Sequence, residues 1–528
     1  MSKGSTQTEF QQTASNAGLI GLAAFGGALV GFVLQLLVAY YFGAGDTTDA
    51  FFMAQSTSEL LGKLLMGGSI TAVFIPMFVE RLVRGKKTDA WGLALNILHI
   101  MAAVYLVFVA LLFLFAEPFV RFIAPGFTGE TFDLTVRLLR VLLPSFCFLF
   151  LVELATSMLH SLRQFALPAL LRIVAPLTSI LTIILTVQAL GIYSLALGVV
   201  IGSALQFTIL SQGLRRQGLS YRFIFAPRDP AIVRLLQLVY PFIFSVLATQ
   251  GAGIAYRMLV SDLDSGSLAS LKFAEKITQL LTIMFLSSVT LVIYPLLSEK
   301  AGKKDSAGMH DTMASAIRLI FFVTIPLVIG VALLRDPLIS FIYQRGSFSA
   351  EDAAMTSIAL LFLVLGLTTN GISSVFGHAV LALQKTKAAV VVTICSQIVA
   401  ISLFVLLVPL MQHAGLALAS SLVPVSAALL YFLYLRRHVP NMFSIFVHRT
   451  YVKTAILAVA LAAGIILSLS LVQGLALPSG VSSLASLIIP SIVGSIIFFG
   501  GAHLWNVQEM QEVLGIVQGK LTKWRRAA

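Results

Sequence analysis

Four basic residues of this chain stand inside long apolar stretches, where a charged side chain is costly: Lys63, Arg257, Lys272 and Lys276. A charge at the centre of a bilayer costs about 2.5–3.5 kcal/mol on insertion scales, so such residues usually serve a ligand or an ion pair. Lys272 and Lys276 are four residues apart and therefore share one helix face, where they repel each other. An anion would relieve that repulsion. We therefore predict that Arg257, Lys272 and Lys276 bind an anionic ligand, with structural ion pairs as the alternative.

Two acidic residues are candidate partners of these cations. Glu59 precedes Lys63 by four residues, the favourable order for an ion pair along a helix, and a structural pair is the preferred interpretation. Glu275 is expected to pair with Arg257 from a neighbouring helix. The remaining basic side chains in the apolar stretches are expected to snorkel, and the histidines to pack or form hydrogen bonds (Arg137, Arg140, Arg172 and Arg318; His99, His160 and His378).

The composition requires that most of the chain lies in lipid. Of 528 residues, 58% are hydrophobic and 11% charged, whereas soluble domains average about 45–50% apolar and about 25% charged residues. Fourteen apolar stretches between residues 17 and 505 are each long enough to cross a bilayer as a helix. The sequence therefore predicts an all-α polytopic membrane protein with about fourteen transmembrane helices.

The two halves of the chain repeat each other at an offset of 219–221 residues. The segment 76–81 aligns with 295–300, and 161–164 aligns with 382–385. Two six-helix lobes of the same orientation are expected, with polar helices two and eight (49–81 and 267–298) lining a space between them, as in carriers built from parallel repeats. The predicted order is a cytoplasmic N-terminus (1–16), an N-lobe (17–213), a cytoplasmic linker (214–231), a C-lobe (232–437), helices thirteen and fourteen with their preceding loop (438–505), and a basic amphipathic cytoplasmic tail (506–528).

The net charge of +13 reports the topology of the chain. Basic residues occupy every second loop, with 24 on the side of the N-terminus and three (Arg121, Arg335 and Arg345) on the other. This split follows the positive-inside rule for a protein with both termini in the cytoplasm, and it argues against binding of nucleic acid. The chain has no GxxxxGK[ST] loop and no extramembrane segment long enough for an enzyme domain, so neither catalysis nor a cofactor is expected. A coupling ion or the membrane potential would have to drive transport.

Several motifs closely resemble those of the MviN/MurJ family, the lipid II flippases of the multidrug/oligosaccharidyl-lipid/polysaccharide exporter superfamily. The resemblance covers essentially the whole chain and rests on Phe42-Gly43-Ala44-Gly45, Thr48-Asp49-Ala50-Phe51-Phe52, Ala124-Pro125-Gly126-Phe127 and Phe341-Ile342-Tyr343-Gln344-Arg345-Gly346-Ser347-Phe348. It implies that Asp49 is retained near the substrate site and that Glu275-Lys276 replaces the family's Asp-Arg pair. The family's substrate-binding arginines of helices one and two fall here on Ala28, Leu34 and Gly62, and an acid of helix one falls on Gln35. Only Lys63 remains basic nearby.

The resemblance implies a flippase of the bacterial inner membrane for an undecaprenyl-pyrophosphate-linked glycan, with lipid II as the leading substrate. The predicted substrate-binding residues are Lys276, Arg257, Lys272, Lys63, Glu275, Glu59 and Asp49. Expected partners are this lipid-linked glycan, membrane lipids and proteins of cell-wall synthesis. The alternatives are a flippase for another lipid-linked polysaccharide, which the missing arginines favour, and a non-transporting scaffold derived from a flippase. A drug/cation antiporter is less consistent, because a cationic cavity repels cationic drugs.

Overall fold

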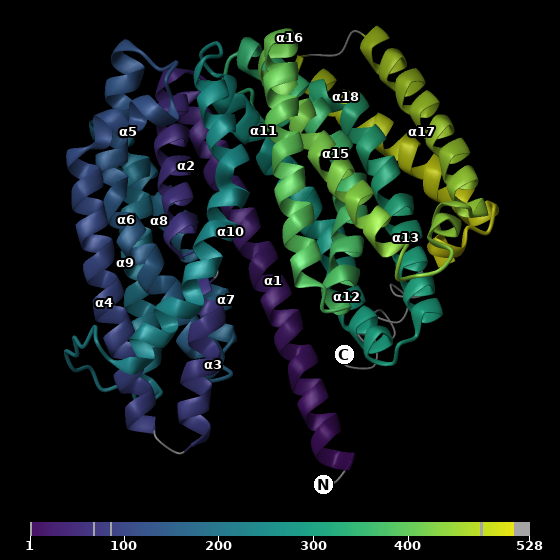
Figure 1. The fold of residues 1–528 in the computed structure, drawn as a ribbon. Coiled ribbons are helices and arrows are strands. Elements are labelled where there is room, and N and C mark those ends of the chain that lie inside the picture. The colour runs from purple at the N-terminus through teal and green to yellow at the C-terminus, as the bar shows by residue number, and fades with distance from the viewer. Residues whose placement is uncertain (1–2, 67–68, 85–86, 476–478, 512–528) are drawn as a thin grey trace, which may run out of the picture. The chain divides into compact units, whose positions relative to one another are not determined.

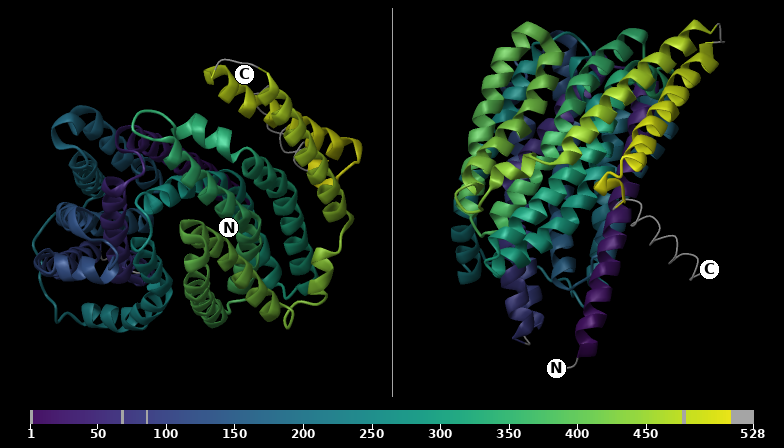
Figure 2. Two further views of the ribbon diagram at one scale, coloured as in Figure 1. Left: turned by 90° about the horizontal axis from the view of Figure 1, so that it is seen from above. Right: turned by 90° about the vertical axis from the view of Figure 1, so that its right-hand side faces the viewer.

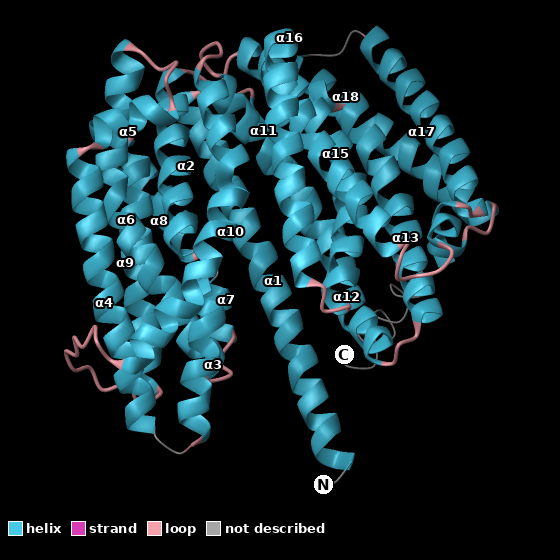
Figure 3. Ribbon diagram, viewed as in Figure 1, coloured by secondary structure: helices cyan, strands magenta, loops and turns pink. Residues whose placement is uncertain are grey.

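Helices make up nearly all of the computed structural model, which describes residues 3–66, 69–84, 87–475 and 479–511, and these residues include no strand (Figures 1 and 3). The chain divides into two compact units, residues 1–269 and 270–528. The first contains α1 (Lys3–Phe42), α2 (Asp46–Met66), α3 (Ser69–Val83), α4 (Lys87–Leu114), α5 (Ala116–Ile123), α6 (Gly129–Ser161), α7 (Ala166–Leu171), α8 (Val174–Leu190), α9 (Tyr193–Arg216) and α10 (Pro230–Ser261).

Helix α11 (Ser267–Leu281) begins in the first unit and continues into the second, where a π-helical turn (Thr282–Leu286) follows it. The second unit then contains α12 (Ser287–Gly302), α13 (Ser306–Leu333), α14 (Arg335–Tyr343), α15 (Ala350–Ala382), α16 (Thr386–Leu435), a 3₁₀ turn (Met442–Phe446), α17 (Arg449–Gly474), α18 (Ser479–Ser495), a second π-helical turn (Ile496–Gly500) and α19 (Gly501–Leu504).

Ten helical segments of the described chain are long and apolar enough to cross a membrane, and they make this a multi-pass membrane protein. One of them, α16, contains two of the predicted spans, because the backbone leaves helical geometry at Gln412. The other predicted spans that are not among the ten correspond to α2 with α3, to α10, and to α11 with α12. These segments are interrupted or carry charges. The predicted count of fourteen is therefore not reached by length and hydropathy alone.

The internal repeat is visible in the backbone. Arg163 and Gln384, which the sequence repeat places in equivalent positions, both have a φ of 59°. Gly191 (φ 52°, ψ −133°) and Gln412 (φ 51°, ψ −130°) share a second unusual conformation at the same offset of 221 residues. Positive φ is uncommon outside glycine, and three of these four residues are not glycine, so the two agreements at one offset support the predicted repeat.

Helix α10, with which the predicted C-lobe opens at residue 232, packs against α2, α3 and α5 within the first compact unit. The predicted boundaries of the lobes stay a prediction. In the second unit, the core joins α12, α13 and α15 around Met313, Ile317 and Phe376, each at most 1% exposed. Helices α17 and α18 pack side by side next to α13, as both views of Figure 2 show.

The predicted linker between the halves is attached to α4. The side-chain amide of Asn96 donates to Ala226 O (3.0 Å) and accepts from Ala226 N (2.8 Å). His99 lies within hydrogen-bond distance of Ile224 O (3.0 Å) and the Tyr221 hydroxyl (3.1 Å). The expectation that His99 forms hydrogen bonds is confirmed, and these bonds fix residues 221–226 along the helix.

The start of the C-terminal tail is anchored in the second unit. Arg318 was expected to snorkel, but its Nε donates to Glu509 Oε1 at 3.0 Å, and that carboxylate is 2% exposed. The Thr450 hydroxyl donates to the other carboxylate oxygen at 2.9 Å. Arg318 is therefore a partner in a buried ion pair that joins α13, α17 and the tail. The predicted amphipathic character of the tail concerns residues beyond Gln511, outside the described residues.

Candidate functional site

The predicted cationic residues of α11 form a polar stripe on an otherwise buried helix. Its apolar face consists of residues at most 6% exposed (Leu271, Phe273, Ala274 and Ile277). The stripe, at positions i, i+3, i+4 and i+7, consists of Lys272, Glu275, Lys276 and Gln279, all at least partly exposed. Because positions three and four apart share a helix face, this spacing gathers both ammonium groups on one side of the helix.

Each lysine of the stripe has an acceptor three residues further along. Lys272 Nζ donates to Glu275 Oε2 at 2.7 Å, and Lys276 Nζ donates to Gln279 Oε1 at 3.3 Å. The Lys272 and Glu275 side chains are 27% and 37% exposed, so both can still meet a ligand or water. Glu275 thus offsets part of the repulsion between the lysines. The predicted pair of Glu275 with Arg257 joins residues of different compact units and stays a prediction.

Aromatic residues of the family-like motif support the stripe from behind. The ring of Phe273, on the buried face of α11, lies 5.1 Å from that of Tyr343 and 5.4 Å from that of Phe348. The Tyr343 hydroxyl donates to Phe273 O at 3.2 Å. From the sequence, this motif marked the resemblance to the family, and no role was predicted for its residues. Its aromatic residues hold α11 in the orientation that exposes Lys272 and Lys276.

Asp49 stabilises the beginning of α11 from a distant part of the chain. Its two carboxylate oxygens accept hydrogen bonds from Gly266 N (2.8 Å) and Ala269 N (2.7 Å), and the residue is 4% exposed. A carboxylate at a helix N-terminus satisfies unpaired N–H groups and complements the helix dipole. Gly266 has a φ of +82°, and a Cβ there would stand 2.5 Å from Ala44 O. These contacts give Asp49 a structural task, and its predicted substrate contact stays untested.

Arg257 is embedded in a hydrogen-bond network of the first unit. Its Nε donates to the Ser56 hydroxyl (3.2 Å), one terminal nitrogen to Ser56 O (2.7 Å) and the other to Gly253 O (2.6 Å). The guanidinium therefore connects α10 to α2. A guanidinium has five N–H donors in a fixed plane, so these three bonds fix the orientation of the group. The cation was predicted from the sequence, whereas its contact with Ser56 was not.

The remaining predicted positions lie on α1 and α2. Glu59 is exposed on α2, whereas the side chain of Lys63 falls outside the described part of the structure, so their ion pair stays a prediction. A Cβ at Gly62 would make ordinary contact with the Phe146 ring, at 3.6 Å. On α1, the positions of the missing arginines, Ala28 and Leu34, are partly exposed (as is Gln35).

One further arginine lies close to this part of α1. A Cβ on Gly27 would stand 3.5 Å from the Cβ of Arg172, because α1 packs against α7 and the residues after it. Arg172 itself is exposed, so its guanidinium stands at the surface beside this turn of α1. It was expected to snorkel, and its packing on α1 was not anticipated.

Comparison with known proteins gives a consistent assignment. Residues 38–481 match the family model described as lipid II flippase MurJ. The chain is 26% identical over 428 residues to a lipid II flippase MurJ of Burkholderia cenocepacia, covering 78% of this chain and 81% of that protein. It is 25% identical over 407 residues to a probable lipid II flippase MurJ of Rickettsia prowazekii, covering 76% and 80% of the two chains.

Solved structures show the same fold. A lipid II flippase MurJ in an inward closed conformation matches with a TM-score of 0.77 and 24% identity, over 91% of this chain and 98% of that one. An inward-facing multidrug transporter of the MATE family, within the MOP superfamily, matches with a TM-score of 0.67 and 14% identity, over 81% and 96%. With most of its length matched by the family model, this chain belongs to the lipid II flippase MurJ family.

Proposed function

We propose that this protein moves an undecaprenyl-pyrophosphate-linked glycan, the peptidoglycan precursor lipid II, from the inner to the outer leaflet of the bacterial cytoplasmic membrane by alternating access. The observation that carries the proposal is the family match over residues 38–481, in which the curated relatives are named lipid II flippases. It is a transporter in this proposal and not an enzyme. Both termini lie in the cytoplasm, and cell-wall synthesis proteins supply and consume the substrate.

The lysines of α11 neutralise the pyrophosphate in this mechanism. They share one face, they are partly exposed, and their present acceptors are a carboxylate and an amide of the same helix. A pyrophosphate oxygen is a stronger acceptor for an ammonium group than the neutral amide of Gln279, because charge-assisted hydrogen bonds are shorter and stronger. Lys276 would therefore exchange its partner for the substrate, while Lys272 would share its charge with Glu275.

Arg257 contributes a positive charge whose position is set by Ser56. Because its network is internal to the first unit, the guanidinium keeps its orientation when substrate is absent, and binding then costs little side-chain entropy. The membrane potential or a coupled ion gives the movement its direction. Glu59, Lys63 and Asp49 complete the proposed substrate-binding set from α2.

The test is rescue of cells depleted of their own lipid II flippase, at matched membrane levels of each variant. Wild type should rescue, and the double variant Lys272→Gln/Lys276→Gln should not. Lys303→Gln is the matched control, because it removes the same charge from an exposed cytoplasmic lysine. Ser56→Ala tests Arg257 without removing its charge, and it should reduce rescue less than Arg257→Gln does. Full rescue by the double variant would contradict anion binding by α11.

A flippase for another lipid-linked glycan is the second candidate, and one observation favours it. The positions where arginines of the family would hold substrate are Ala28, Leu34 and Gly62, none of which can bind an anion through its side chain. Failure of the wild-type protein to rescue, despite normal membrane insertion, would support this candidate. A non-transporting scaffold would also fail to rescue, whereas rescue that persists when all the proposed cations are removed would mean that transport does not depend on them.

A further inference from the structure

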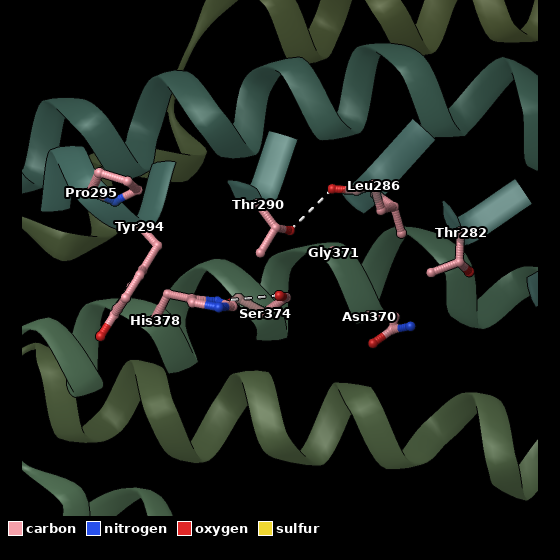
Figure 4. A pocket seen from close by; sticks show the side chains of 9 residues that line it. All are labelled: Thr282, Leu286, Thr290, Tyr294, Pro295, Asn370, Gly371, Ser374 and His378. Atoms are coloured by element: carbon pink, nitrogen blue, oxygen red, sulfur yellow. Dashed lines mark hydrogen bonds between the residues drawn. The ribbon is translucent and has the colours of Figure 1, made fainter. Parts of the chain in front are cut away.

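A cavity of about 500 Å³ lies within the second unit, apart from the charged stripe of α11 (Figure 4). One wall is formed by the π-helical turn and α12, the other by α15. Six of its lining residues bear polar groups: Thr282, Thr290, Tyr294, Asn370, Ser374 and His378. The volume falls in the range of about 300–1,000 Å³ that is usual for small-molecule sites.

The polar groups form two rows that face each other. Asn370, Ser374 and His378 follow one another at intervals of four and therefore share a face of α15. Thr290 and Tyr294 stand on the opposite wall at the same interval, and Figure 4 shows both rows turned toward the cavity. Among the described lining residues there is no lysine, arginine, aspartate or glutamate. The described lining therefore combines hydrogen-bonding groups with a mainly apolar surface, and it contributes no carboxylate, ammonium or guanidinium group.

The backbone around the cavity is specialised to form it. A π-helical turn at Thr282–Leu286 interrupts the helix that continues as α12, and such turns occur frequently at functional sites. On the other wall, a Cβ at Gly371 would stand 2.9 Å from Leu286 Cδ2 and 2.7 Å from Ile320 Cγ2. Only glycine at this position allows α15 to approach the π-helical turn so closely. The shape of the cavity thus depends on the π-helical turn in one wall and on the glycine at position 371 in the other.

The rows combine acceptors and donors of hydrogen bonds. The Thr290 hydroxyl donates to Leu286 O at 3.0 Å, which leaves its oxygen to accept. His378 Nδ1 lies 2.6 Å from Ser374 O, a geometry that assigns a proton to Nδ1, and in the neutral ring Nε2 is then the acceptor. Asn370, which is exposed, carries both donors and an acceptor. The ring of Tyr294 is 41% exposed and adds an apolar surface beside His378, with the ring centroids 5.2 Å apart.

We propose that this cavity is a subsite for the uncharged sugar part of a lipid-linked glycan. Sugar hydroxyls and acetamido groups both donate and accept hydrogen bonds, and sugar rings place apolar C–H faces against aromatic rings. An anion is a poor occupant, because burial of a charge without a partner of opposite sign is costly. The pyrophosphate would then bind elsewhere, at the cations. This inference rests on the proposed function and adds the group of the substrate that the cavity recognises.

Binding of two lipids to the purified full-length protein in nanodiscs tests the subsite. Lipid II carries the sugars and peptide, whereas undecaprenyl pyrophosphate has the same tail and charged group without them. Wild type should bind lipid II more tightly. Asn370→Leu and Thr290→Val should each weaken lipid II binding by about 3- to 10-fold, the usual range for one lost hydrogen bond, and leave undecaprenyl pyrophosphate unaffected.

Ser374→Ala and Ser373→Ala are a matched pair of small changes at neighbouring positions of α15. Ser374 lines the cavity and its neighbour Ser373 does not, so only Ser374→Ala should weaken lipid II binding. Variants are compared only where the melting temperature equals that of wild type. Equal weakening of both lipids by the cavity variants would overturn the subsite, as would unchanged lipid II binding in all of them.

Failure of the subsite and failure of the proposed function give different results. A wild-type protein that prefers lipid II over undecaprenyl pyrophosphate, and loses this preference in the cavity variants, supports the subsite even if it does not rescue depleted cells. A wild-type protein that rescues cells without such a preference overturns the subsite and leaves the proposed function intact. Loss of rescue in His378→Phe with unchanged lipid II binding would assign the cavity to proton movement and would also overturn the proposal.

Discussion

The buried pair of Arg318 and Glu509 offers a quantitative test of how the tail is attached. The two side chains are 15% and 2% exposed, and the Nε–Oε1 distance is 3.0 Å. Removal of one partner from a buried ion pair typically costs about 3–5 kcal/mol, because the other charge stays buried without compensation. Among the described residues, Arg318→Met leaves the carboxylate with the Thr450 hydroxyl alone, at 2.9 Å, so we expect a loss at the upper end of that range.

Glu509→Leu should cost less than Arg318→Met. The remaining guanidinium still donates to the Ser315 hydroxyl at 3.0 Å and is closer to water than the carboxylate. The double variant has neither charge. Its loss in free energy of unfolding should be smaller than the sum of the two single losses by about 2 kcal/mol or more, which is half the cost of one unpaired buried charge. The measurement is a double-mutant cycle of denaturant unfolding in detergent micelles.

The exposed pair of Lys303 and Glu299 is the control for this cycle. Its side chains are 66% and 56% exposed, and the same double-mutant cycle should give no measurable coupling, since exposed ion pairs contribute little. Strictly additive losses at Arg318 and Glu509 would refute the reasoning. They would mean that the two charges do not depend on each other and that the tail is held by its apolar contacts alone.

Three further predictions concern stability. Gln412→Gly should raise the free energy of unfolding by about 1–3 kcal/mol, because a backbone with φ 51° and ψ −130° is strained in a residue that has a Cβ. Gly191→Gln, at the equivalent position, should lower the free energy of unfolding. Unchanged denaturation midpoints would contradict both expectations. Asp49→Asn should destabilise the protein by about 1.5–3 kcal/mol by weakening two charge-assisted bonds, measured in the same way. The pKa of Asp305 lies below its ordinary value of 3.8, chiefly because Gly308 N donates a hydrogen bond to the carboxylate and secondly because Lys300 lies beside it. The carboxylate therefore stabilises the folded protein fully above pH 3.8, and this contribution disappears as the pH falls through the lowered pKa. Asp305→Asn, followed by melting temperature against pH, should remove that part of the acid sensitivity.

Local patterns predicted much of the fold because they depend on neighbours in the chain. The 221-residue offset predicted equivalent positions whose backbone angles agree, since repeated sequence imposes repeated local sterics. The spacing of Lys272 and Lys276 predicted a shared face for the same reason. The π-helical turn between α11 and α12 was not predicted. The pattern of polar and apolar residues does not show where a helix forms a π-helical turn. The position of this turn depends on how α15 packs against the helix.

The sequence by itself determined that this is a multi-pass membrane protein with a duplicated architecture and a cationic helix, because composition, period and spacing are properties of the chain alone. Only the tertiary structure decided the partners of the charges: Asp49 with the turn before α11, 217 residues away, Arg257 with Ser56 and Arg318 with Glu509. A buried charge takes whichever complementary group the packing of helices brings within about 3 Å, and hydrophobic periodicity carries no information about which group that is.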